Sequence, residues 1–230
     1  RVDASTGWAR IRRHERRGQA AEFMTAEGTW VDGIVGLDSE GGWLFFEGSM
    51  TDARQRHVYR IPASGGIPER LSGDRGVHSA TVSSQGKSFL HFGSHREEPA
   101  SVVLRGGDGA SLSLLHAPDR VESDALGLIP PEEFDVTLAD GTVLHGYYYA
   151  PLGTKPDKGW PAILSPYGGP THQVVMDSWR ATANLRTQYW TRKGFAVLKL
   201  DNRGTPRRGA AFSHAVYLDL GNLEIQDQVA

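Results

Sequence analysis

Short runs of apolar and β-branched residues alternate with Gly, Asp, Ser and Pro through the first half of the chain. The runs occupy residues 34–37, 43–46, 57–61, 89–92 and 101–104, and no helical hydrophobic period interrupts them. The pattern predicts an all-β region from residue 1 to about residue 130.

This β region repeats itself. Residues 39–49 can be laid over residues 84–94, with matches of Ser39 to Ser84, Gly41 to Gly86, Gly48 to Gly93 and Ser49 to Ser94. A repeat of about 45 residues that contains only strands has the period of a β-propeller blade. Two repeats with some leading residues are too few to close a ring, and two unrelated hairpins of a β-sandwich are the alternative.

The second half of the chain has a different pattern. β runs at 134–138 and 143–149 flank Asp140-Gly141, which is a strong hairpin signal. A strand at 161–165, a helix at about 179–193 closed by Gly194, and a strand at 195–200 follow. Two buried strands joined by a helix predict a parallel βαβ unit. An antiparallel pair that leads into such a unit is how an α/β-hydrolase sheet begins, whereas no G-x-G-x-x-G or P-loop motif follows either strand.

The strand at 161–165 ends abruptly in Tyr167, two glycines and Pro170. A buried strand that ends in such a loop typically delivers backbone to a reaction site. Gly168 and Gly169 would let a substrate backbone approach, while the flanking prolines restrict the loop. The strand at 195–200 is also followed by a polar, glycine-containing loop, Asp201-Asn202-Arg203-Gly204.

Composition narrows the function classes. The 230 residues carry a formal net charge of −2, so there is no electrostatic reason to propose nucleic acid or an anionic membrane as a partner. The absence of cysteine excludes disulfides, thiolate metal sites and a cysteine nucleophile. The basic cluster near the N-terminus lacks interleaved aromatic residues and is interpreted as a solvated strand and turn; it consists of Arg10, Arg12, Arg13, Arg16 and Arg17.

Other polar groups receive structural interpretations. His91 and His95 have the i, i+4 spacing of a zinc helix, but they lie in a predicted strand and turn, so no metal site is expected. The acidic pairs Glu97-Glu98 and Glu132-Glu133 adjoin prolines and are expected to be solvated at the surface.

The chain begins without Met and ends inside residues 223–229, which have the pattern of an amphipathic helix with Asn222 as N-cap. We therefore expect a fragment of a larger protein.

Several short motifs occur together in a characteristic order. They are Gly28-Thr29-Trp30, residues 138–142, residues 147–151, Tyr167-Gly168-Gly169-Pro170, Asp201-Asn202-Arg203-Gly204 and residues 220–228. In this order and spacing the chain resembles the prolyl oligopeptidase family of serine peptidases, in its dipeptidyl peptidase IV branch. The resemblance implies the C-terminal blades of a β-propeller over residues 1–130. It further implies the N-terminal part of an α/β-hydrolase (peptidase) domain over residues 131–230, truncated before the nucleophile.

The resemblance also implies roles for the two loops. Tyr167 would contribute its hydroxyl to the oxyanion hole, and Gly168, Gly169 and Pro170 would form a substrate-binding loop. Arg203 is favoured as a structural clamp on adjacent loops, with a substrate-facing role as the alternative. The family implies peptide substrates, no cofactor, no metal and a homodimeric full-length protein.

The departures from the family pattern are equally informative. No G-x-S-x-G pentapeptide occurs, and the family's Ser, Asp and His would follow residue 230. His145, His172 and His214 therefore lack a triad partner and are interpreted as strand or loop histidines. The family's double-Glu clamp for the substrate amino terminus belongs to an earlier propeller segment, and neither acidic pair occupies its place.

The sequence thus favours part of a serine exopeptidase that releases dipeptides, often after Pro or Ala, by acyl transfer, with the fragment itself inactive. A non-catalytic β-propeller binding module with a degenerate hydrolase region is one alternative, and an acylaminoacyl peptidase or esterase is another. A cytoplasmic and a periplasmic location both stay open.

Overall fold

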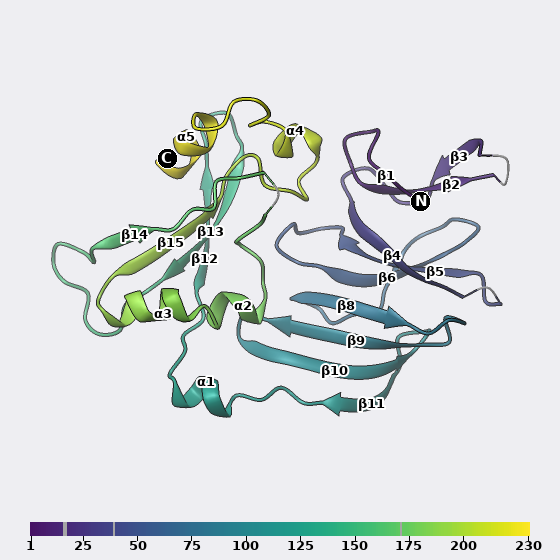
Figure 1. Cartoon of the computed structure of the whole chain (residues 1–230), viewed down its shortest axis with the longest axis horizontal. Coiled ribbons are helices and arrows are strands. Elements are labelled where there is room, and N and C mark those ends of the chain that lie inside the picture. Colours follow the sequence, from purple (N-terminus) through teal and green to yellow (C-terminus); the bar gives the residue numbers. More distant parts are fainter. Residues whose placement is uncertain (16–17, 39, 171) are drawn as a thin grey trace.

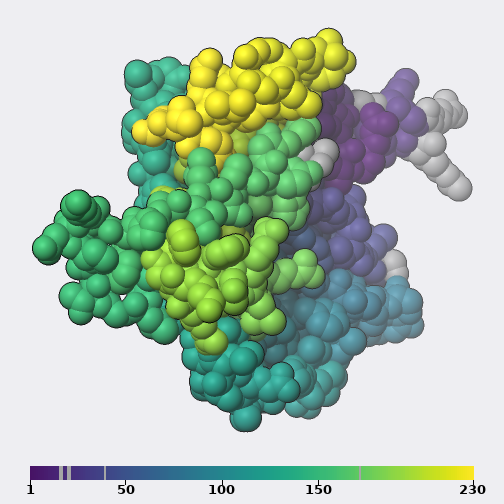
Figure 2. Space-filling model, turned by 60° about the vertical axis from the view of Figure 1, so that its left-hand side comes forward, coloured from purple at the N-terminus to yellow at the C-terminus, as the bar shows by residue number. Residues whose placement is uncertain are grey.

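The computed structural model describes residues 1–15, 18–38, 40–170 and 172–230. In these residues the first half of the chain forms antiparallel sheets, and the second half forms a mixed sheet with short helices beside it (Figure 1). Figure 2 shows green residues of the second half lying directly against blue and teal residues of the first half, and yellow residues lying against the purple ones near the N-terminus. None of the described helices is long and apolar enough to span a membrane.

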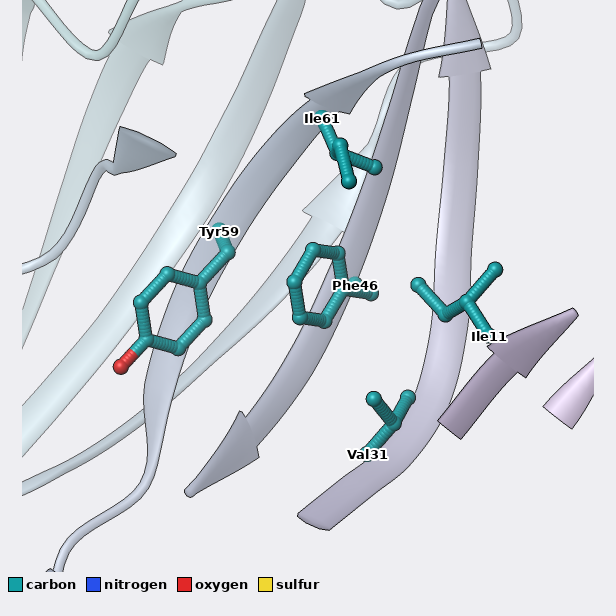
Figure 3. Packing of buried hydrophobic residues seen from close by; sticks show 5 residues of the cluster. All are labelled: Ile11, Val31, Phe46, Tyr59 and Ile61. Atoms are coloured by element: carbon teal, nitrogen blue, oxygen red, sulfur yellow. The ribbon is translucent and has the colours of Figure 1, made fainter. Parts of the chain in front are cut away.

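The N-terminal sheet is small and antiparallel. Its strands are β1 (Val2–Asp3), β2 (Arg10–His14) and β3 (Ala20–Phe23). Ile11 of β2 packs into a buried cluster with Val31, Phe46, Tyr59 and Ile61 of the next sheet (Figure 3). This apolar contact fixes the first sheet on its neighbour.

The predicted repeat corresponds to two four-stranded meander sheets. The first consists of β4 (Trp30–Asp38), β5 (Trp43–Ser49), β6 (His57–Pro62) and β7 (Glu69–Arg70). The second consists of β8 (Val77–Val82), β9 (Ser88–His95), β10 (Glu98–Gly106) and β11 (Ser111–His116). Each repeat pairs its strands within its own sheet, as a propeller blade does. The prediction of blades is confirmed over the β-sandwich alternative; Ser39 itself lies outside the described residues.

One of the repeated glycines, Gly86, is required by a contact between the two blades. Gly86 has φ +71°, and a Cβ at this position would lie 2.5 Å from the Cβ of Asp38 in the first blade. Because no side chain fits there, the turn between β8 and β9 requires glycine. Phe45, Val58 and Phe89 form an apolar cluster between the blades.

A column of three buried histidines lies beside this cluster. His57 of β6 stacks on His78 of β8 at 5.2 Å between ring centroids, and His78 stacks on His91 of β9 at 5.0 Å. The three side chains come from both blades, so the column spans the contact between them.

Hydrogen bonds fix the protonation of two rings in the column. His78 Nε2 must donate to the carbonyl oxygen of Arg75 at 2.8 Å, so in a neutral ring His78 Nδ1 is an acceptor. His91 Nε2 donates to that atom at 3.0 Å, and Arg105 Nε donates to His91 Nδ1 at 3.3 Å. These three hydrogen bonds can form together only while the imidazoles of His78 and His91 are both neutral.

The basic cluster on β2 is paired within its own sheet. The guanidinium groups of Arg10 and Arg12 lie 4.1 and 4.8 Å from the centroid of the Phe23 ring, and Arg13 forms an ion pair with Glu22 at 2.8 Å. An aromatic partner thus comes from the neighbouring strand instead of the same stretch of sequence. Arg16 and Arg17 lie outside the described residues.

One helix departs from the all-β expectation for the first 130 residues. Helix α1 (Val121–Ala125) follows the second blade and is held by an ion pair between Arg120 and Asp124 at 3.1 Å. It is a single short turn without a hydrophobic period, which is why the pattern of apolar residues does not reveal it.

The second half contains the predicted hairpin and βαβ unit, but the first strand of that unit, predicted to be buried, exposes Ala162 and Leu164. The strands are β12 (Glu132–Thr137), β13 (Val143–Tyr149), β14 (Ala162–Leu164) and β15 (Ala196–Asp201), in the order β12-β13-β15-β14. Gly141 has φ +83° in the hairpin turn, and β14 and β15 are parallel. Tyr147, Tyr149 and Val197 are buried against the segment that follows β14. The start of an α/β-hydrolase sheet is therefore confirmed.

The single helix predicted over 179–193 is wrong, because the structure has two. Helix α2 (Trp179–Thr182) is separated from α3 (Leu185–Arg192) by Asn184, whose side chain accepts the N–H of Thr187 and caps α3. The predicted end is confirmed: Gly194 has φ +84°, and its N–H donates to the carbonyl of Thr191.

Two helices follow β15, namely α4 (Ala210–Ser213) and α5 (Leu223–Gln228). Asn222 occupies the predicted N-cap position of α5, but its side chain donates to Asp219 and makes no capping hydrogen bond.

Candidate functional site

Tyr167 lies in the loop at the carboxyl end of β14, two residues after Ser165, whose N–H donates to Leu198 of β15 at 2.8 Å. Its side chain is 50 % exposed, in contrast to the buried tyrosines of β13. The Tyr167 ring meets the ring of His172 edge-on at 5.0 Å between centroids. The loop thus presents a phenol at the end of the parallel strands, where α/β sheets commonly bind ligands.

The two glycines let the backbone pass close to the tyrosine. Gly168 has φ +77°, which disfavours other residues, and a Cβ at Gly169 would lie 2.9 Å from Cε1 of Tyr167. A side chain at position 169 would displace the ring. The glycines predicted to admit a substrate backbone are therefore also needed to seat Tyr167.

The structure brings the two predicted loops together through Asn202, a fully buried residue. Asn202 Nδ2 donates to the Arg203 carbonyl at 2.6 Å and approaches the Gly168 carbonyl at 3.4 Å. Its Oδ1 accepts from Gln228 of α5 at 2.9 Å. Arg203 is the candidate residue that the sequence predicts in the Asp201-Asn202-Arg203-Gly204 motif. In the structure, the side chain of Asn202 contacts the loop that carries Tyr167.

Asp201 anchors the chain that follows Tyr167. It is 2 % exposed and accepts hydrogen bonds from the backbone N–H groups of Val174 at 2.8 Å and Val175 at 3.1 Å. Burial raises the pKa of Asp201 to about 6, although these N–H groups and the side chain of Gln173 act in the opposite direction.

Arg203 ties three elements together. Its Nε lies 3.1 Å from both carboxylate oxygens of buried Asp227 in α5, and its Nη1 donates to Asp140 in the β12–β13 hairpin at 3.0 Å. The hydrogen bonds that Arg203 donates to Asp227 raise the pKa of Arg203 above its ordinary value. These contacts support the clamp interpretation; a substrate-facing role stays a prediction.

The three histidines of the second half have different surroundings. His145 forms a 2.7 Å hydrogen bond with Asp135 across the β12–β13 hairpin, and His214 follows α4. His172 contacts a predicted site residue, through the Tyr167 ring.

A cavity of about 560 Å³ opens between the second blade and the segment after Tyr167. Phe92 and Val77 line it from the blade, and His172, Met176 and Trp179 line it from the other side. A cavity of this size is within the range of small-ligand sites.

An ion-pair network lies where the blades meet the second half. Glu133 of β12 accepts from Arg96 and forms a 3.2 Å pair with Arg54. The expectation that Glu132-Glu133 is only solvated is therefore wrong for Glu133, because its two arginine partners come from loops of the blades, far away in sequence. Glu132, Glu97 and Glu98 are exposed.

Nothing among the described residues groups three or more His, Asp or Glu side chains in a way that could hold a metal ion. His95 pairs with Glu98 at 3.2 Å, whereas His91 belongs to the histidine column. Residues i and i+4 of a strand share a face but lie about 13 Å apart along it, so the two rings have different partners.

Two family models match the chain. The dipeptidyl peptidase IV (DPP IV) N-terminal region matches residues 2–99, and the prolyl oligopeptidase family matches residues 181–230. Both lie in the order expected for a propeller followed by a hydrolase region.

Individual proteins agree with these matches. Dipeptidyl peptidase 8 of Mus musculus is 29 % identical over 90 % of this chain and 25 % of its own length. Dipeptidyl peptidase 4 of Trichophyton equinum is 26 % identical over 99 % of the chain and 30 % of its own length.

A solved structure extends the likeness to three dimensions. The crystal structure of Porphyromonas gingivalis dipeptidyl peptidase 4 superimposes with a TM-score of 0.86 at 26 % identity, over 100 % of this chain and 32 % of that one. The chain spans about a quarter to a third of the length of these relatives. Sequence motifs, fold and similarity agree, and the chain belongs to the prolyl oligopeptidase family, in its dipeptidyl peptidase IV branch.

Proposed function

We propose that this chain is part of a serine-type dipeptidyl peptidase, which releases dipeptides, often after Pro or Ala, from the amino termini of peptides by acyl transfer. Residues 1–130 would belong to the propeller and residues 131–230 to the peptidase domain. The observation that carries the proposal is the half-exposed Tyr167 at the carboxyl end of β14, in a chain of this family. The cavity beside His172 would receive the peptide.

Tyr167 would act as an oxyanion-hole donor. When a nucleophile attacks the scissile carbonyl, the oxygen gains negative charge, and a phenol already fixed in place can donate to it without reorganising. The loss of one such donor typically costs about 3 kcal/mol of transition-state stabilisation, or about 100- to 1000-fold in kcat. Gly168, Gly169 and Pro170 would lie along the substrate backbone, and Arg203 would hold the adjoining loops.

The nucleophile must come from elsewhere in the full-length protein, because this chain contains no G-x-S-x-G pentapeptide. Residues 1–230 alone are therefore expected to hydrolyse no Xaa-Pro or Xaa-Ala amide. Turnover by this purified segment would contradict that expectation.

The decisive experiment measures hydrolysis of a fluorogenic Xaa-Pro amide by the full-length protein and its Tyr167→Phe variant. The phenylalanine keeps the ring and removes only the hydroxyl, so kcat should fall about 100-fold or more while KM changes little. An unchanged kcat would remove Tyr167 from the oxyanion hole. A folded full-length protein that hydrolyses none of the dipeptidyl substrates would refute the proposed function.

A further inference from the structure

The segment between Tyr167 and α2 is held from two sides. On one side, Asp201 accepts the backbone N–H groups of Val174 and Val175. On the other, Gln173 Nε2 donates to the carbonyl of Ala53 in the first blade at 2.9 Å. The loop that carries Tyr167 is therefore bound to the blades as well as to its own sheet.

Asp177 makes the densest set of these contacts. Its carboxylate accepts from Arg75 Nε at 3.0 Å and Arg75 Nη2 at 3.1 Å, which is a two-point contact with one guanidinium. It also accepts from the backbone N–H and the Nη1 of Arg96, at 3.1 and 3.2 Å. Its own N–H donates to the carbonyl of Arg54 at 2.9 Å.

The charges around Asp177 are balanced. The residue is 2 % exposed. Burial alone would raise the pKa of Asp177, but the hydrogen bonds from Arg75 and the Arg96 N–H, together with both positive charges, lower it. Arg75 also pairs with exposed Glu97 at 3.3 Å, and Arg96 also pairs with Glu133. The carboxylate is thus kept ionised although it is buried.

We propose that Asp177 is a positioning residue for Tyr167, through which Arg75, in the connection between the two blades, and Arg96 of the second blade fix the far end of the tyrosine loop. The inference rests on the proposed function, since it assigns the arginine contacts a role in the oxyanion hole. It makes the second blade a determinant of the turnover rate and not only a wall of the substrate cavity.

The geometry indicates that the Asp177 contacts orient the loop that carries Tyr167 and do not only stabilise the interface between the two halves. A buried ion pair stabilises a fold no better than apolar packing does, but it fixes direction through its hydrogen bonds. Because the loop contains two glycines, its shape depends on contacts outside it. These contacts come from Asn202 at Gly168, from the His172 ring at Tyr167, and from the segment 173–177, which Asp201 and Asp177 hold. A displacement of about 1 Å in a catalytic group can lower a rate about 100-fold.

The test uses the full-length protein and the dipeptidyl substrate named above. Asp177→Asn keeps the shape but removes the charge, and we expect kcat to fall about 10-fold or more with KM within about twofold. Arg75→Gln should do the same from the blade side. Glu97→Gln is the matched control, because it removes another carboxylate partner of Arg75 that does not touch the loop, and kcat should stay as in the wild type.

A double variant separates positioning from a loss of stability. Since Asp177 acts through Tyr167, Tyr167→Phe with Asp177→Asn should be no slower than Tyr167→Phe alone. Multiplied effects, or an unchanged kcat in folded Asp177→Asn, would overturn the inference. If Asp177→Asn does not fold, Arg75→Gln, alone and with Tyr167→Phe, decides by the same criteria. An inactive wild type would instead refute the proposed function.

Discussion

The histidine column between the blades makes the stability of this protein dependent on pH. His57 and His91 are almost inaccessible, at 2 % and 4 % exposure. Burial, followed by the charge of His78, lowers the pKa of both to about 4. The pKa of His78 is lowered as well, by burial first. In addition, a proton on His78 Nδ1 would face the N–H of His91, so ionisation breaks the hydrogen-bonded chain.

The direction and size of the effect follow from these values. The unfolded chain takes up protons at its histidines below about pH 6.5, whereas folded His57 and His91 resist until about pH 4. The unfolding free energy therefore falls as the pH drops from 6.5 to 4. Each of the two histidines contributes about 1.4 kcal/mol per pH unit in this window, or about 3 kcal/mol per histidine over the whole window. This loss is a large share of the stability of an ordinary domain.

Urea unfolding at pH 7, 6 and 5 measures the slope. His91→Gln retains a side-chain donor but cannot be protonated, so its slope should be smaller than that of the wild type by about one proton. His116→Gln is the matched control, because His116 is exposed on β11 and lies outside the histidine column. Equal slopes for His91→Gln and the wild type would refute the reasoning.

Three further predictions concern the end of β15. Gly204→Ala should lower the unfolding free energy by about 2 kcal/mol in thermal or urea unfolding, because Gly204 has φ +106° and a Cβ would lie 2.8 Å from Val216; an unaltered midpoint would contradict this. Asp227→Asn should cost about 2 kcal/mol in the same assay by removing the charged acceptor of Arg203, and full stability would show that the clamp contributes nothing. Asp201→Asn tests a pH dependence of opposite sign to that of the histidines. Since burial raises the pKa of Asp201 to about 6, the unfolding free energy of the wild type should rise relative to that of the variant as the pH falls from 7 to 5. A difference that stays constant over this range would contradict the prediction.

Several features of the fold could be predicted from local patterns. The Asp140-Gly141 turn, the end of α3 at Gly194 and the strand-only repeat all depend on residues close in sequence. The break between α2 and α3 was missed, although Asn184 three residues before Thr187 is a capping signal. Helix α1 was missed because one short turn carries no hydrophobic period.

The order of blades and mixed sheet and the position of the Tyr167 loop could be predicted from the sequence, because period, turn chemistry and motif spacing are properties of neighbouring residues. The side chains that hold the loop could not be predicted, because they meet only when the chain is folded. Arg75 and Asp177 are 102 positions apart, and nothing in either local pattern indicates a partner. Glu133, predicted to be solvated, is paired for the same reason. A buried charge requires an opposite charge nearby in space, and packing alone brings such residues together.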